Sequence, residues 1–404
     1  MRIDKIILNN FRNYGRLDLD VGPSVNIVYG DNGEGKTNLI ESICVGSCIV
    51  SHKTNKDSKL VKIGEDNYSV ELIMTDDDGS EIMLKDVVQL VNDTPKRKMY
   101  CNNGAIDKIS EYMGICNTVI FAPEDLNIIK GSPIERRKFL NLMISKVSPT
   151  YVNLIGNTNR LINQKNETLK NARFGNANIE ANLDFWDISL SDLMAEMIIY
   201  RYRFIAILND KASGYHSSIS GNKEILKLKY STISGCIELL ERFLEDNSIT
   251  DEFKSRGLNK ANFEALKGIL SSHIYNKLQT SRRYDIEKGI ASVNIKKDDI
   301  TILLNDKEAR VYSSQGQQRS AALSLKLAEL SIIKQFAGST PILLLDDVFS
   351  ELDVNRRVSL ISSISDTQIF ITCTDRGYIE KEISALIGDR SDVRYFEVKN
   401  GTIS

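Results

Sequence analysis

A glycine-rich loop is the feature that most restricts how this chain can fold. The segment GDNGEGKTN, residues 30–38, follows the apolar run VNIVY and precedes apolar residues at helical spacing. This strand–loop–helix context is the one that a phosphate-binding loop requires. Glycines there let successive backbone N–H groups converge on phosphate oxygens at the positive end of the helix. The pattern therefore predicts an α/β fold with a nucleotide site, although a glycine-rich turn without a ligand is the alternative.

The residues of the loop have distinct predicted roles. Lys36 is expected to reach the β- and γ-phosphates, and Thr37 places a hydroxyl where Mg²⁺ needs an oxygen ligand. ATP and Mg²⁺ are therefore the predicted ligands. The predicted nucleotide-binding residues of the loop are Gly30, Asp31, Asn32, Gly33, Glu34, Gly35, Lys36, Thr37 and Asn38.

Two acids at the end of a second apolar run complete the predicted site. The run ILLL, residues 342–345, reads as a buried strand that delivers Asp346 and Asp347 at its carboxyl end, where ligands of parallel sheets bind. Asp346 is the predicted metal ligand, and Asp347 is the predicted catalytic residue that polarises the attacking water. The distance along the chain from Lys36 is too long for a compact GTPase or small kinase, so a large segment must be inserted.

A third motif points to ATPases whose site is shared between two copies. In SSQGQQ, Ser314 and the N–H groups of Gly316 and Gln317 begin a long predicted helix, where hydroxyl and helix dipole can hold a γ-phosphate. Alone, this would be only a helix N-cap. The loop Ser350-Glu351-Leu352-Asp353 then matches the segment that links the two sites of such a dimer, which makes Asp353 a further predicted nucleotide contact.

Composition and element patterns divide the chain into three parts. The 404 residues, 42% hydrophobic and 26% charged, can bury a large core, and the absence of a signal peptide or an 18-residue apolar run predicts a cytoplasmic protein. Residues 1–130 are β-rich, with a hairpin at DDDG. Residues 131–284 are mostly helical from Ser132-Pro133 onward, and residues 285–404 return to the ATPase pattern. The two ends must therefore meet in one α/β domain.

A family resemblance is carried by several motifs in order. These are FRNY, GDNGEGKTN, FAPEDL, KGSPIERRKFL, SSQGQQRSAALSLKLAEL and ILLLDDVFSELD. Together they resemble the RecF family of bacterial DNA replication and repair ATPases. The resemblance implies an ABC-type (Rad50/SMC-like) ATPase head with a mostly helical inserted arm. This sequence differs from the usual family pattern at residues 294–297. These residues are Asn-Ile-Lys-Lys, whereas family members usually carry GPHR, the first four residues of a GPHRDD stretch.

The resemblance also implies roles and partners. Arg12 would approach the nucleotide, Glu124 of FAPEDL would act near the metal and the attacking water, and Thr374 would take the position where transporters carry a histidine. The implied activity is a weak, DNA-stimulated ATPase that drives formation of a homodimer. The implied partners are double-stranded DNA near single-strand gaps and RecR, with RecO, in recombinase loading at stalled forks.

Lysines after the phosphate-loop helix are the predicted DNA contacts. The net charge of −2 requires local basic patches, and Lys53, Lys56, Lys59 and Lys62 recur at three-residue intervals. The basic triplets at 96–98 and 136–138 are further candidates, and solvated charged faces are the alternative.

Two other classes of ATPase share some of these motifs. One is the ATPase head of another SMC-like or antiphage complex. The other is the energising subunit of a membrane transporter, which lacks a large helical insertion and would carry a glycine pair in the third motif.

Overall fold

The computed structural model describes residues 1–172, 179–349, 352–353, 356–357, 360, 367–377, 380 and 392–403. Its helices are α1 (Lys36–Cys48), α2 (Ile109–Tyr112), α3 (Leu126–Lys130), α4 (Pro133–Val147), α5 (Pro149–Ala172), α6 (Ile179–Ser220), α7 (Cys236–Asp246), α8 (Thr250–Ser255), α9 (Lys260–Lys288), α10 (Ala309–Tyr312) and α11 (Gln315–Ala337), with 3₁₀ turns η1 (Asp57–Lys59), η2 (Pro123–Asp125) and η3 (Ile295–Lys297). Its strands are β1 (Arg2–Phe11), β2 (Tyr14–Asp20), β3 (Val25–Tyr29), β4 (Asn67–Thr75), β5 (Glu81–Val91), β6 (Thr94–Cys101), β7 (Gly104–Ile106), β8 (Thr118–Phe121), β9 (Leu226–Ser231), β10 (Asp299–Leu304), β11 (Lys307–Glu308), β12 (Ile342–Asp346), β13 (Ile369–Cys373), β14 (Val393–Lys399) and β15 (Thr402–Ile403).

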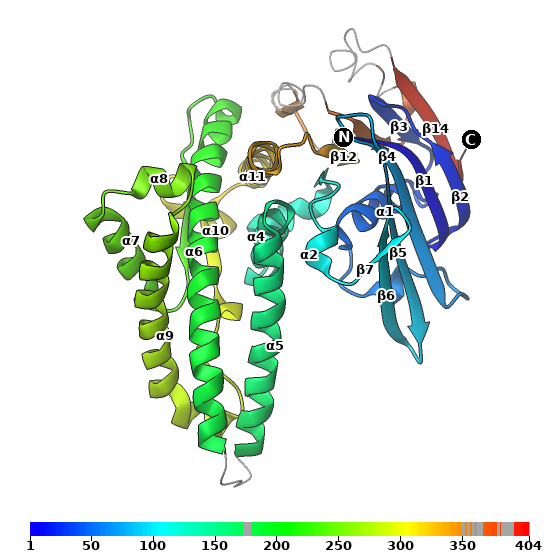
Figure 1. Cartoon of the computed structure of the whole chain (residues 1–404). Helices are drawn as coiled ribbons and strands as arrows, with labels where there is room; N and C mark the ends of the chain where they lie inside the picture. The colour runs from blue at the N-terminus through cyan, green and yellow to red at the C-terminus, as the bar shows by residue number, and fades with distance from the viewer. Residues whose placement is uncertain are drawn as a thin grey trace.

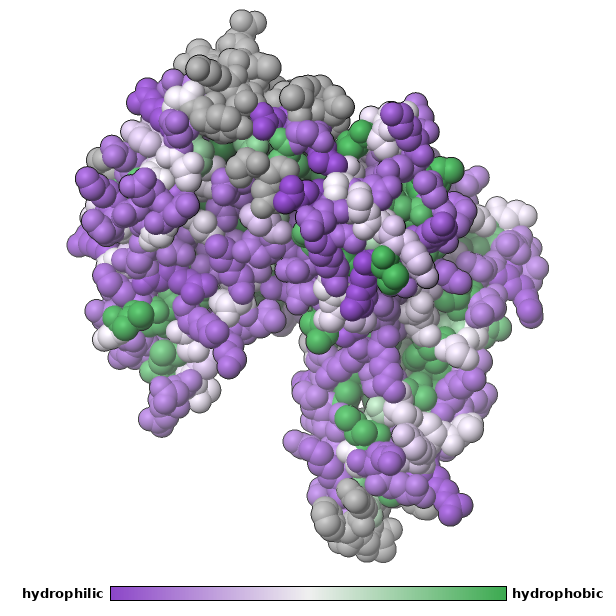
Figure 2. Space-filling view, turned by 180° about the vertical axis from the view of Figure 1, so that it is seen from behind, coloured by the Kyte–Doolittle hydropathy of each residue, from purple (hydrophilic) through white to green (hydrophobic). Residues whose placement is uncertain are grey.

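Strands β1–β8 and β12–β15 gather in a lobe, and long helices project from it as an arm (Figure 1). Helices α5, α6 and α9, with the shorter α7 and α8, form this arm. Seen from behind, a deep notch separates the lower parts of lobe and arm, and hydrophobic residues lie in small separate patches on a mostly hydrophilic surface (Figure 2). In the described part of the chain, no helix is both long and apolar enough to cross a membrane.

One sheet of the lobe is built from both ends of the chain. Its strand order is β15-β14-β3-β13-β12-β8, and every pair from β14 to β8 is parallel. β3 lies between β13 and β14, with Ile27 opposite Ile371 on one side and Tyr395 on the other. All five residues of β12 and of β13 are buried, as expected for parallel strands covered on both faces. The prediction that the two ends form one α/β unit is confirmed.

A second, antiparallel sheet covers the other side of α1. Its order is β2-β1-β4-β5-β6-β7. Helix α1 is buried along most of its length because it lies between the two sheets, and its side chains share a hydrophobic core with β1, β4 and β12. Gly46 permits this packing, since a Cβ there would lie 2.8 Å from a methyl of Val70 in β4. The hairpin predicted at DDDG joins β4 to β5.

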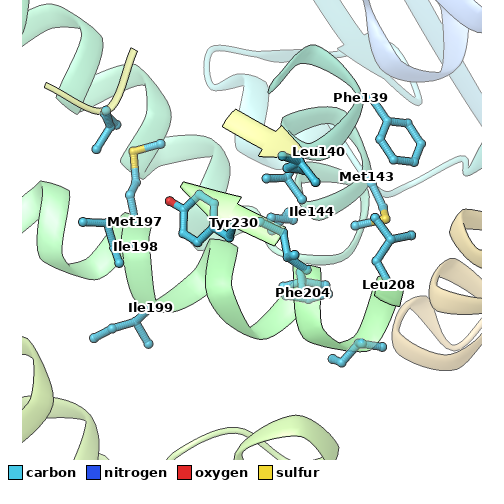
Figure 3. Close-up of a cluster of buried hydrophobic side chains, with 14 of the residues drawn as sticks. Phe139, Leu140, Met143, Ile144, Met197, Ile198, Ile199, Phe204, Leu208 and Tyr230 are labelled. Atoms are coloured by element: carbon cyan, nitrogen blue, oxygen red, sulfur yellow. The ribbon is translucent and has the colours of Figure 1, made fainter. Parts of the chain in front are cut away.

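Apolar side chains of α4 join the lobe to the arm. Figure 3 shows Phe139, Leu140, Met143 and Ile144 of α4 beside side chains of α6 and Tyr230 of β9. Helix α4 begins at Pro133, as predicted, but the Ser132 side chain makes no cap hydrogen bond. The contact between α4 and α6 therefore places the long arm helix close to the FAPEDL segment, from which α4 is separated only by the short helix α3.

The arm is also continuous with the C-terminal part of the chain. Strand β9 pairs with β10 in a small antiparallel sheet of order β11-β10-β9. Helix α6 packs on α11 in the same hydrophobic core. A domain boundary at residue 284 would fall inside α9, and the division into 1–130, 131–284 and 285–404 stays a prediction.

Candidate nucleotide site

The glycine-rich segment joins β3 to α1 and curls around the amino group of its own lysine. Lys36 Nζ donates to the carbonyls of Gly30, at 2.5 Å, and Asp31, at 2.8 Å. Gly30 has φ of 146°, and a Cβ there would lie 2.4 Å from the carbonyl oxygen of Val398 in β14. This position therefore requires glycine, both for its backbone conformation and for its close approach to the neighbouring strand.

Residues of the FRNY segment and of the C-terminal hairpin brace the loop from outside. Asn13 Nδ2 donates to the Glu34 carbonyl at 2.8 Å, and Asn38 Nδ2 donates to Asn13 Oδ1 at 2.8 Å. The same Glu34 carbonyl accepts from the N–H of Gly401 at 3.1 Å. Asn13 was not among the predicted site residues, although its place beside Arg12 in FRNY could have suggested it.

A cavity of about 270 Å³ opens over the loop. It brings together the loop, the acidic end of β12 and the end of β13. Its lining residues are Asn32, Gly33, Gly35, Lys36, Thr37, Asn38, Lys53, Asp347, Thr372 and Thr374. Thr374 is among these lining residues, and its equivalence to the histidine of transporters stays a prediction.

Asp346 is held by hydroxyl groups at the edge of this cavity. Its Oδ1 accepts from Thr37 Oγ1 at 2.9 Å and from Thr372 Oγ1 at 2.8 Å. Thr372 Oγ1 also accepts from the N–H of Asp347 at 2.9 Å. Burial raises the pKa of Asp346 against the opposing effect of the two threonine hydrogen bonds. Thr372 was missed by the sequence reasoning, although it follows the apolar residues IFI in strand β13, beside β12.

The donors at this point fit a magnesium ion. The Thr37 hydroxyl and the Asp346 carboxylate already meet, and both are hard oxygen ligands. Mg²⁺ commonly takes one or two such protein ligands and completes its shell with phosphate oxygens and waters. The two residues predicted as metal ligands are therefore brought together by the fold.

Glu124 and His52 lie beside a second cavity, of about 230 Å³. Lys53 Nζ lies 3.9 Å from Glu124 Oε1 and also lines the first cavity, so it stands between the two. Glu124 Oε2 and both ring nitrogens of His52 are buried without a hydrogen-bond partner among the described residues. Burial lowers the pKa of His52 to about 4. The fold thus places Glu124 next to the nucleotide cavity through Lys53.

The Arg12 side chain makes its hydrogen bonds inside the lobe. Its Nε and Nη2 donate to the two carboxylate oxygens of Glu41 in α1, each at 2.8 Å, and its Nη1 donates to the Lys59 carbonyl at 2.8 Å. Burial alone would raise the pKa of Glu41, but hydrogen bonds from Arg12 and Ser51 outweigh it and lower that pKa. Arg12 is not among the residues that line the nucleotide cavity. It instead ties α1 to the loop of residues 50–62.

The predicted DNA-contacting lysines lie on that loop. Apart from the single turn η1 it contains no helix, so their three-residue spacing does not align them on one face. Lys53 faces the nucleotide cavity, Lys56 and Lys59 are exposed, and Lys62 is half-buried beside Gly15. Their contact with DNA stays a prediction.

One arginine of each of the two other basic triplets is engaged within the molecule. Arg97 pairs with Asp57 and Asp86, each at 3.0 Å. Arg136 pairs with Asp299 at 2.7 Å.

Asp298 and Asp299 connect the C-terminal part of the chain to the arm and to α4. Asp298 is buried and accepts hydrogen bonds from Arg201 of α6, Tyr230 of β9 and Thr232. The preceding Asn294, which stands in the departure from the usual family stretch, caps η3 by accepting from the N–H of Lys296 at 2.9 Å. These acids therefore have structural partners in this chain.

The third motif caps α11 as predicted. Ser314 Oγ accepts from the Gln317 N–H at 3.3 Å, and Gln317 Oε1 accepts from the Ser314 N–H at 2.7 Å. Arg356 donates to the Gly316 carbonyl at 2.7 Å and pairs with Asp353 at 2.9 Å. Ser350 and Glu351 lie outside the described residues. Among the described residues that line the nucleotide cavity, none comes from this cap.

Comparison with known proteins supports the reading of these motifs. Residues 2–394 match the family model described as the RecF/RecN/SMC N terminal domain. The DNA replication and repair protein RecF of Lachnospira eligens is 36% identical, and that of Clostridium acetobutylicum is 34% identical; each alignment covers 100% of this chain and 99% of the relative.

Solved structures give the same result. One described as the recombination mediator protein RecF with ATP in the RecFOR pathway has a TM-score of 0.84 at 30% identity. Another, RecF-ATPrS, has a TM-score of 0.81 at 30% identity, and each match covers 100% of this chain and 97% of the other. These findings confirm the predicted ABC-type ATPase head with an inserted helical arm, and they favour RecF over the other two ATPase classes considered. The chain belongs to the RecF family of DNA replication and repair proteins.

Proposed function

We propose that this chain binds ATP and Mg²⁺ in the cavity over its phosphate loop. Backbone N–H groups of residues 30–37 and the amino group of Lys36 would hold the phosphates, at the N-terminus of α1. Thr37 and Asp346 would hold the metal, whose charge would offset that of the phosphates during hydrolysis. The structures of RecF with ATP at 30% identity support this assignment.

Hydrolysis requires a group that orients the attacking water. We assign this role to Asp347, which lines the cavity and whose N–H is fixed by Thr372. Glu124 assists from the neighbouring cavity, where its Oε2 has no hydrogen-bond partner among the described residues. Lys53 would partly balance the charge of Glu124, and it also lines the cavity over the loop.

The bound ATP would be fully enclosed only where two copies of the chain meet. The observation that carries this proposal is the separation of the Ser314 cap from the cavity that holds Lys36 and Thr37. A capped helix start with an available hydroxyl and the positive end of a dipole suits a γ-phosphate. A second copy, related by two-fold symmetry, can supply this cap to each cavity.

The resulting dimer is an ATP-driven clamp with weak, DNA-stimulated hydrolysis. Lys56, Lys59 and Lys62 on the loop of residues 50–62 would contact duplex phosphates near a single-strand gap. RecR, with RecO, would be its partners in recombinase loading. The RecFOR pathway named for the solved relatives supports this part of the proposal.

A mixing experiment tests the shared site. Lys36→Met removes the phosphate contact, and Ser314→Arg blocks the cap. Each variant alone should show neither ATP-dependent dimerisation in sedimentation nor hydrolysis. When the two variants are mixed, each heterodimer has two ATP sites. One site combines an intact loop with an intact cap and the other carries both substitutions, so hydrolysis should partly return. Failure of the mixture to recover activity, together with hydrolysis by Ser314→Arg alone, would show that the pocket of one chain is self-sufficient.

A further inference from the structure

A chain of side-chain hydrogen bonds joins the start of α11 to the arm. Gln317 Nε2 donates to Glu224 Oε1 at 2.9 Å. Glu224 Oε2 lies 3.0 Å from His216 Nε2, and His216 Nδ1 lies 3.2 Å from Ser324 Oγ. We call Gln317, Glu224, His216 and Ser324 the cap–arm chain. It begins at Gln317, which hydrogen-bonds to the capping residue Ser314, and returns to α11 two turns later at Ser324.

Glu224 determines how the Gln317 amide is oriented. The oxygen of that amide accepts from the Ser314 N–H, and its nitrogen donates to Glu224. A carboxylate can only accept, so the amide nitrogen must point toward Glu224 and its oxygen toward Ser314. Loss of the carboxylate would leave the amide without this constraint.

The backbone around Glu224 is fixed on both sides. Before it, the turn that ends α6 is closed by a hydrogen bond from the Asn222 N–H to the Ser217 carbonyl at 2.8 Å. After it, Ile225 exchanges hydrogen bonds with Asn305, each at 2.9 Å. His216, which anchors the carboxylate, is fully buried. Glu224 is therefore held by hydrogen bonds at the end of the arm, where its side chain contacts the cap.

The opposite side of the cap is held by the segment after β12. Arg356 donates to the Gly316 carbonyl and, at 3.0 Å, to Ser320 Oγ. The cap is thus contacted both by Arg356 of the segment after β12 and by Glu224 of the arm. Arg356 and Glu224 come from different parts of the chain, and both hold the start of α11.

We propose that Glu224 is a positioning residue for the nucleotide bound by the second copy of the chain. Through Gln317 it sets the direction of the Ser314 hydroxyl and of the first N–H groups of α11. A displacement of the arm at the end of α6 would be transmitted to the shared ATP site. A macromolecule that binds the arm could thereby favour or oppose dimer closure. This inference rests on the shared site proposed above.

The test compares ATP-dependent dimerisation with ATP binding by the monomer. Glu224→Ala should weaken the dimer by about 10- to 100-fold, the effect expected for losing a hydrogen bond to a charged group. ATP affinity of the isolated chain should stay at the wild-type value, because the cavity over the loop contains no residue of the cap–arm chain. Glu224→Gln keeps an acceptor for Gln317 and should restore most of the dimerisation.

Two further variants make the result specific. Glu241→Ala removes another arm glutamate whose hydrogen bond goes to Tyr202, and it should dimerise as the wild type does. Gln317→Ala combined with Glu224→Ala should be no weaker than Gln317→Ala alone, because both act through one contact.

The outcomes separate this inference from the proposed function. If the wild-type chain does not dimerise with ATP, the shared site itself is wrong. If the wild type dimerises and Glu224→Ala does so equally well, only the role of Glu224 is wrong. The proposed role of Glu224 would also be contradicted if the two substitutions weakened dimerisation additively, or if the Glu224→Ala monomer lost ATP binding.

Discussion

At the scale of single residues, two threonines decide how Asp346 presents its carboxylate. Thr37 and Thr372 both donate to Oδ1, so this oxygen is fixed where β12, β13 and the phosphate loop meet. Thr372 also fixes the N–H of Asp347. One hydroxyl on a neighbouring strand therefore contacts both acids of the motif, Asp346 through its carboxylate and Asp347 through its N–H.

His52 gives a prediction about pH. Burial lowers its pKa to about 4, whereas a histidine in the unfolded chain titrates near 6.5. The unfolded chain therefore takes up the proton first as pH falls, and stability is lost between about pH 6.5 and 4. His52→Gln should reduce the loss of unfolding free energy between pH 7 and pH 5 by about 1–2 kcal/mol, measured with urea. An unchanged loss would contradict the burial argument.

At the scale of elements, a buried charge cluster fastens α11 to α4. Lys146 of α4 donates to Glu329 of α11 at 3.0 Å and to the Thr118 carbonyl at 2.8 Å. Lys326 also pairs with Glu329 and lies 3.8 Å from Asp125. Burial would raise the pKa of Glu329, but the two lysines outweigh it and lower that pKa. The cluster holds the helix of the cap against the segment that carries Glu124.

Removing the central carboxylate should be costly. Glu329→Gln leaves two buried lysines with an uncompensated charge, and such losses cost about 3–5 kcal/mol. Denaturant unfolding at pH 7 measures the change. Glu111→Gln, which breaks an exposed pair with Lys108, is the control and should cost no more than about 1 kcal/mol. Equal effects for the two variants would show that the cluster adds nothing to stability.

Elements with strong local patterns were predictable from the sequence. The strand–loop–helix around Lys36, the acidic strand β12 and the capped helix α11 form where their motifs indicate. Strands β6 and β7 were not predicted, although their turns at Asn92-Asp93 and Asn102-Asn103 carry the positive φ angles typical of hairpins. The asparagines could have indicated both turns.

Contacts between distant segments could not be read from local patterns. The spacing of Lys53, Lys56 and Lys59 suggested a common face, but only tertiary structure shows that Lys53 points toward the nucleotide cavity. Glu224 lies in no recognisable sequence motif. Its contact with Gln317 depends on where α6 ends relative to α11. Such residues acquire a function from packing alone.

At the scale of the whole molecule, binding of DNA should depend on salt more than on base sequence. Lys56→Gln and Lys59→Gln should each weaken binding of duplexes of any sequence and lower the slope of log affinity against log salt by about 1. Fluorescence anisotropy at several salt concentrations, with ATP present, measures both quantities. Lys254→Gln, in an arm ion pair with Asp210, is the control. Unchanged slopes in both loop variants would place the DNA elsewhere.

The position of β14 beside β3 has a consequence for synthesis of the protein. The ribosome makes the phosphate loop early, yet Gly30 packs on Val398, and Glu34 is held by Gly401. A nascent chain that has not reached residue 393 therefore lacks the strand and the hairpin that brace its phosphate loop from outside. Competence to bind nucleotide should consequently be acquired late in translation, so that incomplete polypeptides do not capture ATP or recruit full-length copies.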